Sequence, residues 1–268
     1  LDSVRNDQAD IAPATVTVSD YTGVYDGLAH GATIVGAPGE DLSNSLFMTR
    51  HSNVGTYTEG WTFSNANYVA ASGTNTITIT KANATIVTSG HNGVYDGAAH
   101  TATATATGVL GESLSGLVLN ATPHSNAGTY SDSWTFTDST GNYNSTSGSV
   151  VSSITAKAIS HTIGNDSHVY GDTVNLAATL GATFLTGVNG ETLGIAYSST
   201  GNSATANVGS YAITGSVSDG TGLASNYTVA PTDGTLTVGA KTISHTIGNT
   251  SHVYGDTVNL AATLGATF

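Results

Sequence analysis

The stretch Thr74-Asn75-Thr76-Ile77-Thr78-Ile79-Thr80 alternates threonine with asparagine or isoleucine. In a strand, successive side chains point to opposite faces of the sheet, so this order puts the isoleucines on one face and the threonines on the other. Residues 14–18, Ala-Thr-Val-Thr-Val, have the same alternation. One apolar face and one polar face are typical of an antiparallel sheet that covers a core on one side. The sequence therefore predicts half-buried antiparallel strands.

The composition agrees with an all-β fold. The chain has 268 residues, 33 of them glycine, and only 9% are charged. Few leucines and few long charged side chains argue against helices, while β-branched residues and glycines favour strands and tight turns. Because there is no cysteine, packing, hydrogen bonds or bound ions must hold the fold without disulfides.

Several classes of protein are excluded or disfavoured. Five Lys and Arg against 18 Asp and Glu give a net charge of −13, which would repel the phosphates of nucleic acid. No apolar run approaches the roughly 20 residues of a membrane span, and any secretion signal has been removed or lies upstream. The sequence also lacks a cysteine nucleophile, a Gly-x-Ser-x-Gly elbow and a His-Glu-x-x-His motif, so we expect no enzyme.

The chain repeats itself. Residues 158–184 recur as 242–268 with two changes, Ala158 against Thr242 and Asp166 against Thr250. A looser pair precedes them, because Gly-Val-Tyr-Asp-Gly occurs at 23–27 and again at 93–97. Self-similarity at long offsets indicates an array of modules.

The three lysines, Lys81, Lys157 and Lys241, each follow a threonine-rich apolar alternation and mark the module boundaries. We predict a linker or the end of a preceding module at 1–13, β-sandwich modules at 14–81, 82–156 and 157–240, and a truncated fourth module at 241–268. Since the fourth copy stops at Phe268, we expect the chain to be a piece of something longer.

Two kinds of turn signal distinguish the modules. Asp26-Gly27 and Asp96-Gly97 predict two-residue type I′ hairpin turns, because Asp-Gly readily supplies positive φ angles. Gly171-Asp172 has the reverse order and fits a type II′ turn better. A functional interpretation would make Asp26 and Asp96 metal or ligand contacts, but turn chemistry alone explains them.

Aromatic residues recur at equivalent places before and within one strand of each module. Tyr57 follows Asn53-Val54-Gly55-Thr56, and similar stretches precede Tyr130 and Tyr211. A tyrosine at such a corner of an immunoglobulin-like sandwich bonds back to upstream backbone, which is the role that we assign to these three. Trp61 and Trp134 share one strand face with them and with Phe63 and Phe136, as expected of core strands.

Taken in order, Gly-Val-Tyr-Asp-Gly with a following Ala-His, then Asn-x-Gly-Thr-Tyr, then Asn-Tyr resembles the YDG-type repeats of large bacterial surface proteins. The Val-Tyr-Gly-Asp version at 169–172 and 253–256 resembles the related MBG-type repeats. The resemblance covers the chain from about Ala14. It implies immunoglobulin-like β modules strung in tandem, as in filamentous-haemagglutinin-like adhesins, and it implies no catalytic residues.

Calcium at the module junctions is the one cofactor that we consider, because carboxylate and carbonyl oxygens are its ligands. The candidate ligands are Asp20, Asp41, Asp138, Asp166, Asp219 and Asp233. They are scattered along the chain and no Asp-x-Asp run concentrates them, so they can equally serve solubility. The recurring histidines fit local hydrogen bonds better than a clustered zinc site.

We therefore predict an all-β chain of tandem immunoglobulin-like antiparallel β-sandwich modules in an elongated array, from a secreted or surface-anchored bacterial protein. It would be a non-enzymatic stalk or multivalent adhesion module that contacts other copies of the module and surface glycans or host or matrix proteins. One alternative is a self-assembling extracellular filament or surface layer, in which like chains pair by β-strand addition. Another is a carbohydrate-binding accessory module that uses Trp61 and Trp134.

Overall fold

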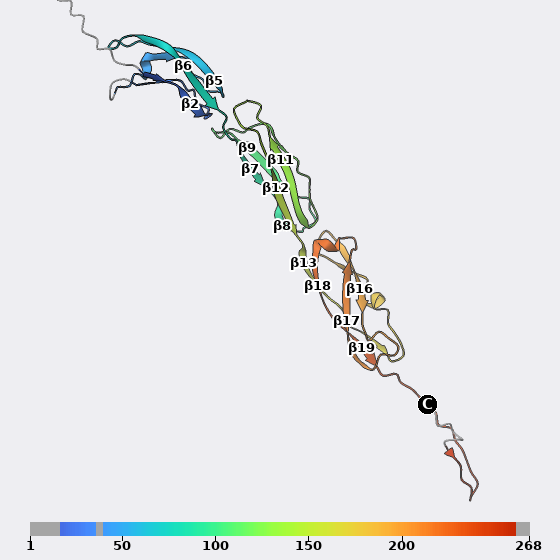
Figure 1. Ribbon diagram of the computed structural model, residues 1–268. Helices are drawn as coiled ribbons and strands as arrows, with labels where there is room; N and C mark the ends of the chain where they lie inside the picture. Colours follow the sequence, from blue (N-terminus) through green and yellow to red (C-terminus); the bar gives the residue numbers. More distant parts are fainter. Residues whose placement is uncertain (1–16, 36–39, 261–268) are drawn as a thin grey trace, which may run out of the picture. The chain divides into compact units, whose positions relative to one another are not determined.

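The computed structural model describes residues 17–35 and 40–260 (Figure 1). The predicted linker at 1–13 and the last eight residues of the truncated fourth module lie outside the described residues. Two compact units divide the chain: unit 1 comprises Leu1–Val94 and Ala98–Thr155, and unit 2 comprises Tyr95–Gly97 and Ala156–Phe268. The four module ranges stay predictions, and they serve below as names for stretches of the chain.

The first module, in unit 1, contains two sheets. β1 pairs with β3, and a four-stranded sheet has the order β2-β6-β5-β4. Figure 1 labels β2, β5 and β6 in the blue and cyan part of the ribbon. The elements are β1 (Thr17–Ser19), β2 (Tyr21–Val24), β3 (Thr33–Val35), the 3-10 helix η1 (Ser43–Ser45), β4 (Leu46–Met48), β5 (Gly55–Phe63) and β6 (Ala71–Thr80).

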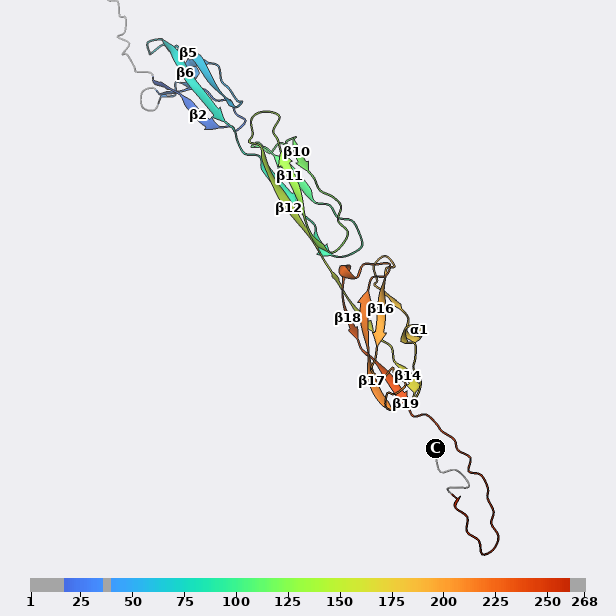
Figure 2. The ribbon, with the colours of Figure 1, turned by 45° about the vertical axis from the view of Figure 1, so that its right-hand side comes forward.

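The second module, also in unit 1, repeats this arrangement. β7 pairs with β9, and the four-stranded sheet has the order β10-β11-β12-β8. Figure 2 shows β10, β11 and β12 side by side in the green part of the ribbon. The strands are β7 (Thr85–Ser89), β8 (Asn92–Val94), β9 (Thr103–Thr107), β10 (Leu117–Leu119), β11 (Gly128–Phe136) and β12 (Thr146–Thr155).

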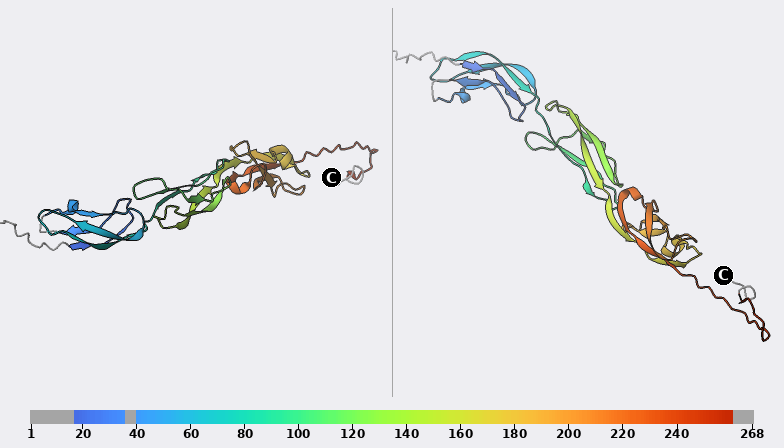
Figure 3. Two further views of the ribbon diagram at one scale, coloured as in Figure 1. Left: turned by 90° about the horizontal axis from the view of Figure 1, so that it is seen from above. Right: turned by 60° about the horizontal axis from the view of Figure 1, so that its bottom comes forward.

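Unit 2 has a two-stranded sheet, β13-β18, and a five-stranded sheet of order β14-β19-β17-β16-β15. Both views in Figure 3 show the chain continuing beyond β19 (Gly234–Gly239), and residues 241–259 contain no helix or strand. The elements are β13 (Lys157–Thr162), β14 (Asp166–Val169), α1 (Leu176–Leu180), β15 (Thr183–Leu185), β16 (Thr192–Ser198), β17 (Gly209–Ser218), the 3-10 helix η2 (Ala224–Asn226), β18 (Tyr227–Thr232) and β19 (Gly234–Gly239).

The all-β prediction is confirmed, and the alternation at 74–80 forms the end of β6. Its isoleucines are buried, with Ile77 0% and Ile79 2% exposed, while Thr80 is exposed. The neighbouring strand β5 continues this inward face, with Phe63 1% exposed. In unit 2, β17 likewise has a buried face, with Ile213 0% exposed. Sheets with one buried face are what the period-two pattern predicts.

The sheets also contain parallel pairs that the alternation did not indicate. β2 runs parallel to β6, β8 parallel to β12, and β14 parallel to β19. In each module a short early strand thus lies beside the last long strand. Such a pair needs a long connection, and here nearly the whole module supplies it.

The predicted type I′ hairpins at Asp26-Gly27 and Asp96-Gly97 are therefore wrong. β2 pairs with β6 rather than with the strand that follows it. The positive φ angles are present, 79° at Gly27 and 76° at Gly97. The Asp26 carboxylate accepts a hydrogen bond from the Leu28 N–H at 2.9 Å, so the signal marks a local Asx-type turn at the end of a strand.

The type II′ turn predicted at Gly171-Asp172 is also wrong. The Asp172 N–H donates to the Val169 carbonyl at 3.1 Å, which makes Gly171 the third residue of the turn. Its φ is 94°. A positive φ at the third position defines type II, whereas type II′ needs it at the second position.

Candidate functional site

The three corner tyrosines bond back to upstream backbone. The Tyr130 hydroxyl donates to the Asn126 carbonyl at 2.8 Å, and the Tyr211 hydroxyl donates to the Asn207 carbonyl at 2.8 Å. The Tyr57 hydroxyl lies 3.2 Å from the Asn53 carbonyl. Each bond ties the start of a long strand to the turn before it, which is the geometry of a tyrosine corner.

Both tryptophans lie over a glycine of the neighbouring strand. Trp61 pairs with Gly73 and Trp134 with Gly148. A Cβ on Gly148 would be 2.6 Å from the Trp134 ring, and one on Gly73 would be 2.9 Å from the Trp61 ring. Half-buried rings that cover a glycine on the inward face belong to the packing of the sheet.

A cluster of two tyrosines and one glutamate occurs in unit 1. The rings of Tyr25 and Tyr143 meet edge to face, with centroids 5.4 Å apart. The Tyr143 hydroxyl donates to the Glu112 carboxylate at 2.5 Å and accepts from the Val109 N–H at 3.0 Å. Burial, and then the bond to Glu112, raise the pKa of Tyr143 to about 12. We call these three residues, and their equivalents, the tyrosine–glutamate cluster.

The same cluster occurs in unit 2, with Tyr95, Tyr227 and Glu191. The two rings again meet edge to face, with centroids 5.3 Å apart. Glu191 accepts both hydroxyls, from Tyr95 at 2.7 Å and from Tyr227 at 2.5 Å. Burial raises the pKa of both tyrosines, that of Tyr227 to about 12. Two neutral phenols that donate to one carboxylate make a directional, charge-assisted contact.

The cluster of unit 1 joins residues of the first two modules. Tyr25 packs against the buried core of the second module, in which Tyr143 is 1% exposed. Asn142, just before it, accepts the Val54 N–H at 2.9 Å and donates to the Asn53 side chain at 3.2 Å. In this Asn-Tyr pair, Asn142 therefore hydrogen-bonds the Asn53-Val54 turn of the first module, and Tyr143 packs against the Tyr25 ring.

The glutamates were missed by the sequence analysis, although a signal for them exists. Glu112 ends Gly-Val-Leu-Gly-Glu and Glu191 ends Gly-Val-Asn-Gly-Glu. Glu40 ends Gly-Ala-Pro-Gly-Glu in the first module, and the Tyr68 hydroxyl bonds its carboxylate. A Gly-x-x-Gly-Glu motif thus precedes Asn-Tyr in all three modules.

The recurring histidines form pairs across strands. His30 faces His51, and His100 faces His124, each through an isolated antiparallel bridge. Carboxylates lie beside them: Asp26 is 2.7 Å from His30, Glu59 is 2.8 Å from His51, and Asp132 is 3.3 Å from His124. The bond from His30 holds the pKa of Asp26 below its usual value. These contacts are local hydrogen bonds of the module.

The six calcium candidates lie apart, and five of them accept nearby hydrogen bonds. Asp20 accepts the Thr76 N–H, Asp41 that of Ser43, Asp138 that of Tyr143, Asp166 that of Ser167, and Asp219 that of Ala224. Asp233 lies between β18 and β19. Within 17–35 and 40–260, no three His, Asp or Glu residues come together as metal ligands.

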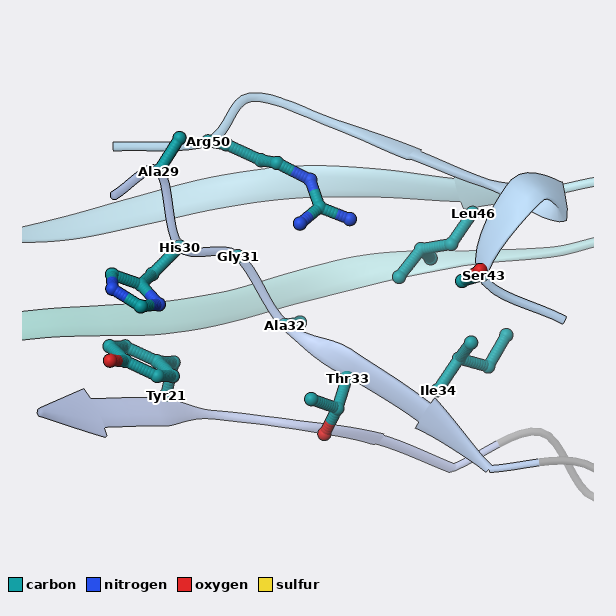
Figure 4. A pocket seen from close by; sticks show the side chains of 10 residues that line it. All are labelled: Tyr21, Ala29, His30, Gly31, Ala32, Thr33, Ile34, Ser43, Leu46 and Arg50. Atoms are coloured by element: carbon teal, nitrogen blue, oxygen red, sulfur yellow. The ribbon is translucent and has the colours of Figure 1, made fainter. Parts of the chain in front are cut away.

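A hollow in the first module is lined by Tyr21, His30, Ser43, Leu46 and Arg50 among others (Figure 4). In this lining the His30 ring already stacks on the Tyr21 ring, with centroids 4.3 Å apart. No helix of the described residues is long and apolar enough to cross a membrane.

The fold and the repeated clusters define a class: tandem all-β repeat proteins. Residues 159–237 match the MBG domain of YGX type, and residues 14–83 match a second MBG domain model. Together the matches span more than half of the sequence, so the chain belongs to the MBG-domain family. The resemblance stated from the Tyr-Asp-Gly and Tyr-Gly-Asp motifs is confirmed.

No curated protein matches the chain. Among solved structures, it is similar to cadherin domains 3–6 of protocadherin gamma B2 (9% identity, TM-score 0.24, 85% of this chain and 73% of that chain). It is also similar to domains 4–9 of the surface layer protein SbsC (10%, 0.25, 86% and 48%). A third is the Bacteroides ovatus glucan utilization protein SGBP-B, in complex with a mixed-linkage heptasaccharide (11%, 0.18, 91% and 76%).

Proposed function

We propose that the chain is a non-enzymatic structural and adhesive repeat region of a secreted or surface-anchored bacterial protein, where it works as a stalk or as one part of a multivalent adhesion surface. The observation that carries this proposal is the tyrosine–glutamate cluster. It occurs with the same three residue types in both units, at recurrences of the same three short motifs.

The contacts in unit 1 support a role in linking modules. Tyr25 and Asn142 connect the first module to the second through ring packing and hydrogen bonds to backbone. Buried aromatic pairs contribute about 0.5–1.5 kcal/mol beyond the area that they bury. A small module without disulfides buries a modest core, so such contacts add to its own stability as they do in other repeat arrays.

Hydrodynamics of residues 1–268 test the proposal. We expect a monomer at all concentrations in size-exclusion chromatography with light scattering, with a hydrodynamic radius well above that of a compact protein of equal mass. Growth into high-mass species with concentration would contradict the stalk and favour the filament of like chains. A radius that falls in chelator would assign calcium to the module junctions, whereas an unchanged radius would leave the tyrosine and asparagine contacts as the linkage.

A further inference from the structure

Tyr25, Tyr95 and Tyr170 occupy the same position in their modules. Each directly follows a short strand, β2, β8 or β14, that runs parallel to the last long strand of the module. The Tyr25 N–H donates to the Thr80 carbonyl at 2.8 Å, and the Tyr170 N–H donates to the Gly239 carbonyl at 2.9 Å. The backbone therefore presents the three rings in equivalent ways.

The three rings differ in what covers them. Tyr95 is 5% exposed under Tyr227, and Tyr25 is half-buried against Tyr143. Tyr170 is 45% exposed, beside the exposed Val169. In the first two cases the covering tyrosine belongs to an Asn-Tyr pair further along the chain. After β19, the described residues 241–259 form no strand that could cover Tyr170.

The strand pairing of unit 2 shows which segments a further module of this kind needs. β13 pairs with β18 and β14 pairs with β19, so the first part of the module is held by its last part. Residues 242–268 copy 158–184, which contain nearly all of β13 together with β14. The printed sequence holds no second copy of β18 and β19 to pair with them.

We propose that Tyr170 is a docking residue for a complete module of the same kind that begins at Lys241. The tyrosine of that module's Asn-Tyr pair packs edge-on against the Tyr170 ring, and the glutamate of its Gly-x-x-Gly-Glu motif accepts both hydroxyls, as Glu191 does for Tyr95 and Tyr227. The Lys241 ammonium lies beside Gly171, where its charge favours an incoming carboxylate.

This inference rests on the proposed role as a tandem repeat scaffold. It adds a statement of which residues of two consecutive modules contact one another. The ring of Tyr-Asp-Gly or Tyr-Gly-Asp comes from the leading module, while the second ring and the glutamate come from the following module. In unit 2 Glu191 accepts both hydroxyls, so a following module that lacks this glutamate removes the shared acceptor of two phenols, which is costly. In unit 1 the equivalent Glu112 accepts the Tyr143 hydroxyl.

The test extends residues 1–268 by a copy of residues 185–240, which completes a fourth module from the sequence of the third. Tyrosine nitration is followed by peptide mass spectrometry in the chain with and without the extension. We expect Tyr170 to react about two- to tenfold more slowly in the extended chain, which is the range that the free energy of a buried aromatic contact corresponds to. Tyr254, which holds the same position in the fourth copy, is the control: it is 103% exposed in the parent chain and should slow no further than the rate at which the 45% exposed Tyr170 reacts in that chain.

Two further measurements make the result decisive. Tyr227→Ala, made in the appended copy alone, should restore fast reaction at Tyr170. Hydrogen exchange of the appended residues reports whether they fold. Fast reaction of Tyr170 beside a protected extension would overturn the docking proposal, and an unprotected extension would overturn it too, because no module would then begin at Lys241. Either result leaves the hydrodynamic test of the proposed function unaffected.

Discussion

At the scale of single residues, two constraints favour glycine in the Tyr-Asp-Gly turn: a positive φ and a close neighbouring side chain. Gly27 has a φ of 79°, a region that L side chains rarely adopt, and a Cβ there would lie 2.6 Å from Leu110. Gly97 has a φ of 76° and a Cβ there would meet Asn189 at 2.3 Å. Both neighbours lie in the Gly-x-x-Gly-Glu loops. The turn is therefore shaped for the approach of that loop as well as for its own bend.

Gly27→Ala should destabilise unit 1 more than Gly111→Ala. Both glycines have φ near 80°, but the space around Gly111 is open. The backbone cost of about 1–3 kcal/mol is common to both variants, while displacement of the exposed Leu110 side chain adds a smaller cost to the first alone. Urea unfolding of the whole chain measures the difference. Equal losses would mean that the Leu110 contact does not constrain the turn.

The buried phenols predict a loss of stability at alkaline pH. The pKa values of Tyr143 and Tyr227 are raised to about 12, against about 10 for an unfolded tyrosine. A raised pKa in the folded state contributes stability that is fully present below pH of about 10 and is lost as the pH rises through about 12.

The expected slope is about 1.4 kcal/mol per pH unit for each such tyrosine. Unfolding in urea at several pH values between 9 and 12 measures it. Tyr143→Phe with Tyr227→Phe should flatten the decline, because phenylalanine has no proton to lose. An unchanged slope in the double variant would assign the alkaline loss to other groups.

At the scale of elements, the sequence predicted strands better than it predicted their partners. Alternation is a local property, so residues 74–80 were correctly predicted as a strand with isoleucines inward. Pairing is not local: β2 lies beside β6, which is more than 45 residues further along the chain. The Asp-Gly signal was therefore assigned to a hairpin that the topology excludes. The tyrosine–glutamate cluster was missed for a related reason, since its parts come from distant segments, even though each part repeats visibly in the sequence.

Cross-strand packing of tryptophan over glycine predicts a further substitution. Gly73→Val puts two methyl groups under the Trp61 ring, where a Cβ alone would already be 2.9 Å from it. We expect a loss of about 1–3 kcal/mol from overpacking and a red shift of tryptophan emission as Trp61 moves toward water. Gly60→Val is the control, because Gly60 is exposed and has only a backbone oxygen at 4.0 Å. A blue shift, or equal losses for both variants, would contradict this packing.

At the scale of the whole molecule, the question is whether neighbouring modules unfold together. The first two modules belong to one compact unit, and Tyr25 packs on the core of the second module. Asn142 is 7% exposed and makes two hydrogen bonds to the Asn53-Val54 turn. Because stability in repeat arrays sums the terms of the modules and of their interfaces, these contacts should couple the two unfolding transitions.

Asn142→Ala should separate those transitions. The substitution leaves the Val54 N–H without its acceptor, at a cost of about 1–3 kcal/mol to the interface, while most of each module's own core is untouched. Scanning calorimetry of the whole chain should then resolve the first module as a separate, earlier peak. Asn144→Ala is the matched control: Asn144 is exposed and bonds the side chain of Asn83 at 2.8 Å, so its peak pattern should equal that of the parent chain. If Asn142→Ala keeps a coupled transition, Asn142 is not needed for coupling and the Tyr25–Tyr143 contact suffices. Separate peaks already in the parent chain would show that the two modules unfold independently.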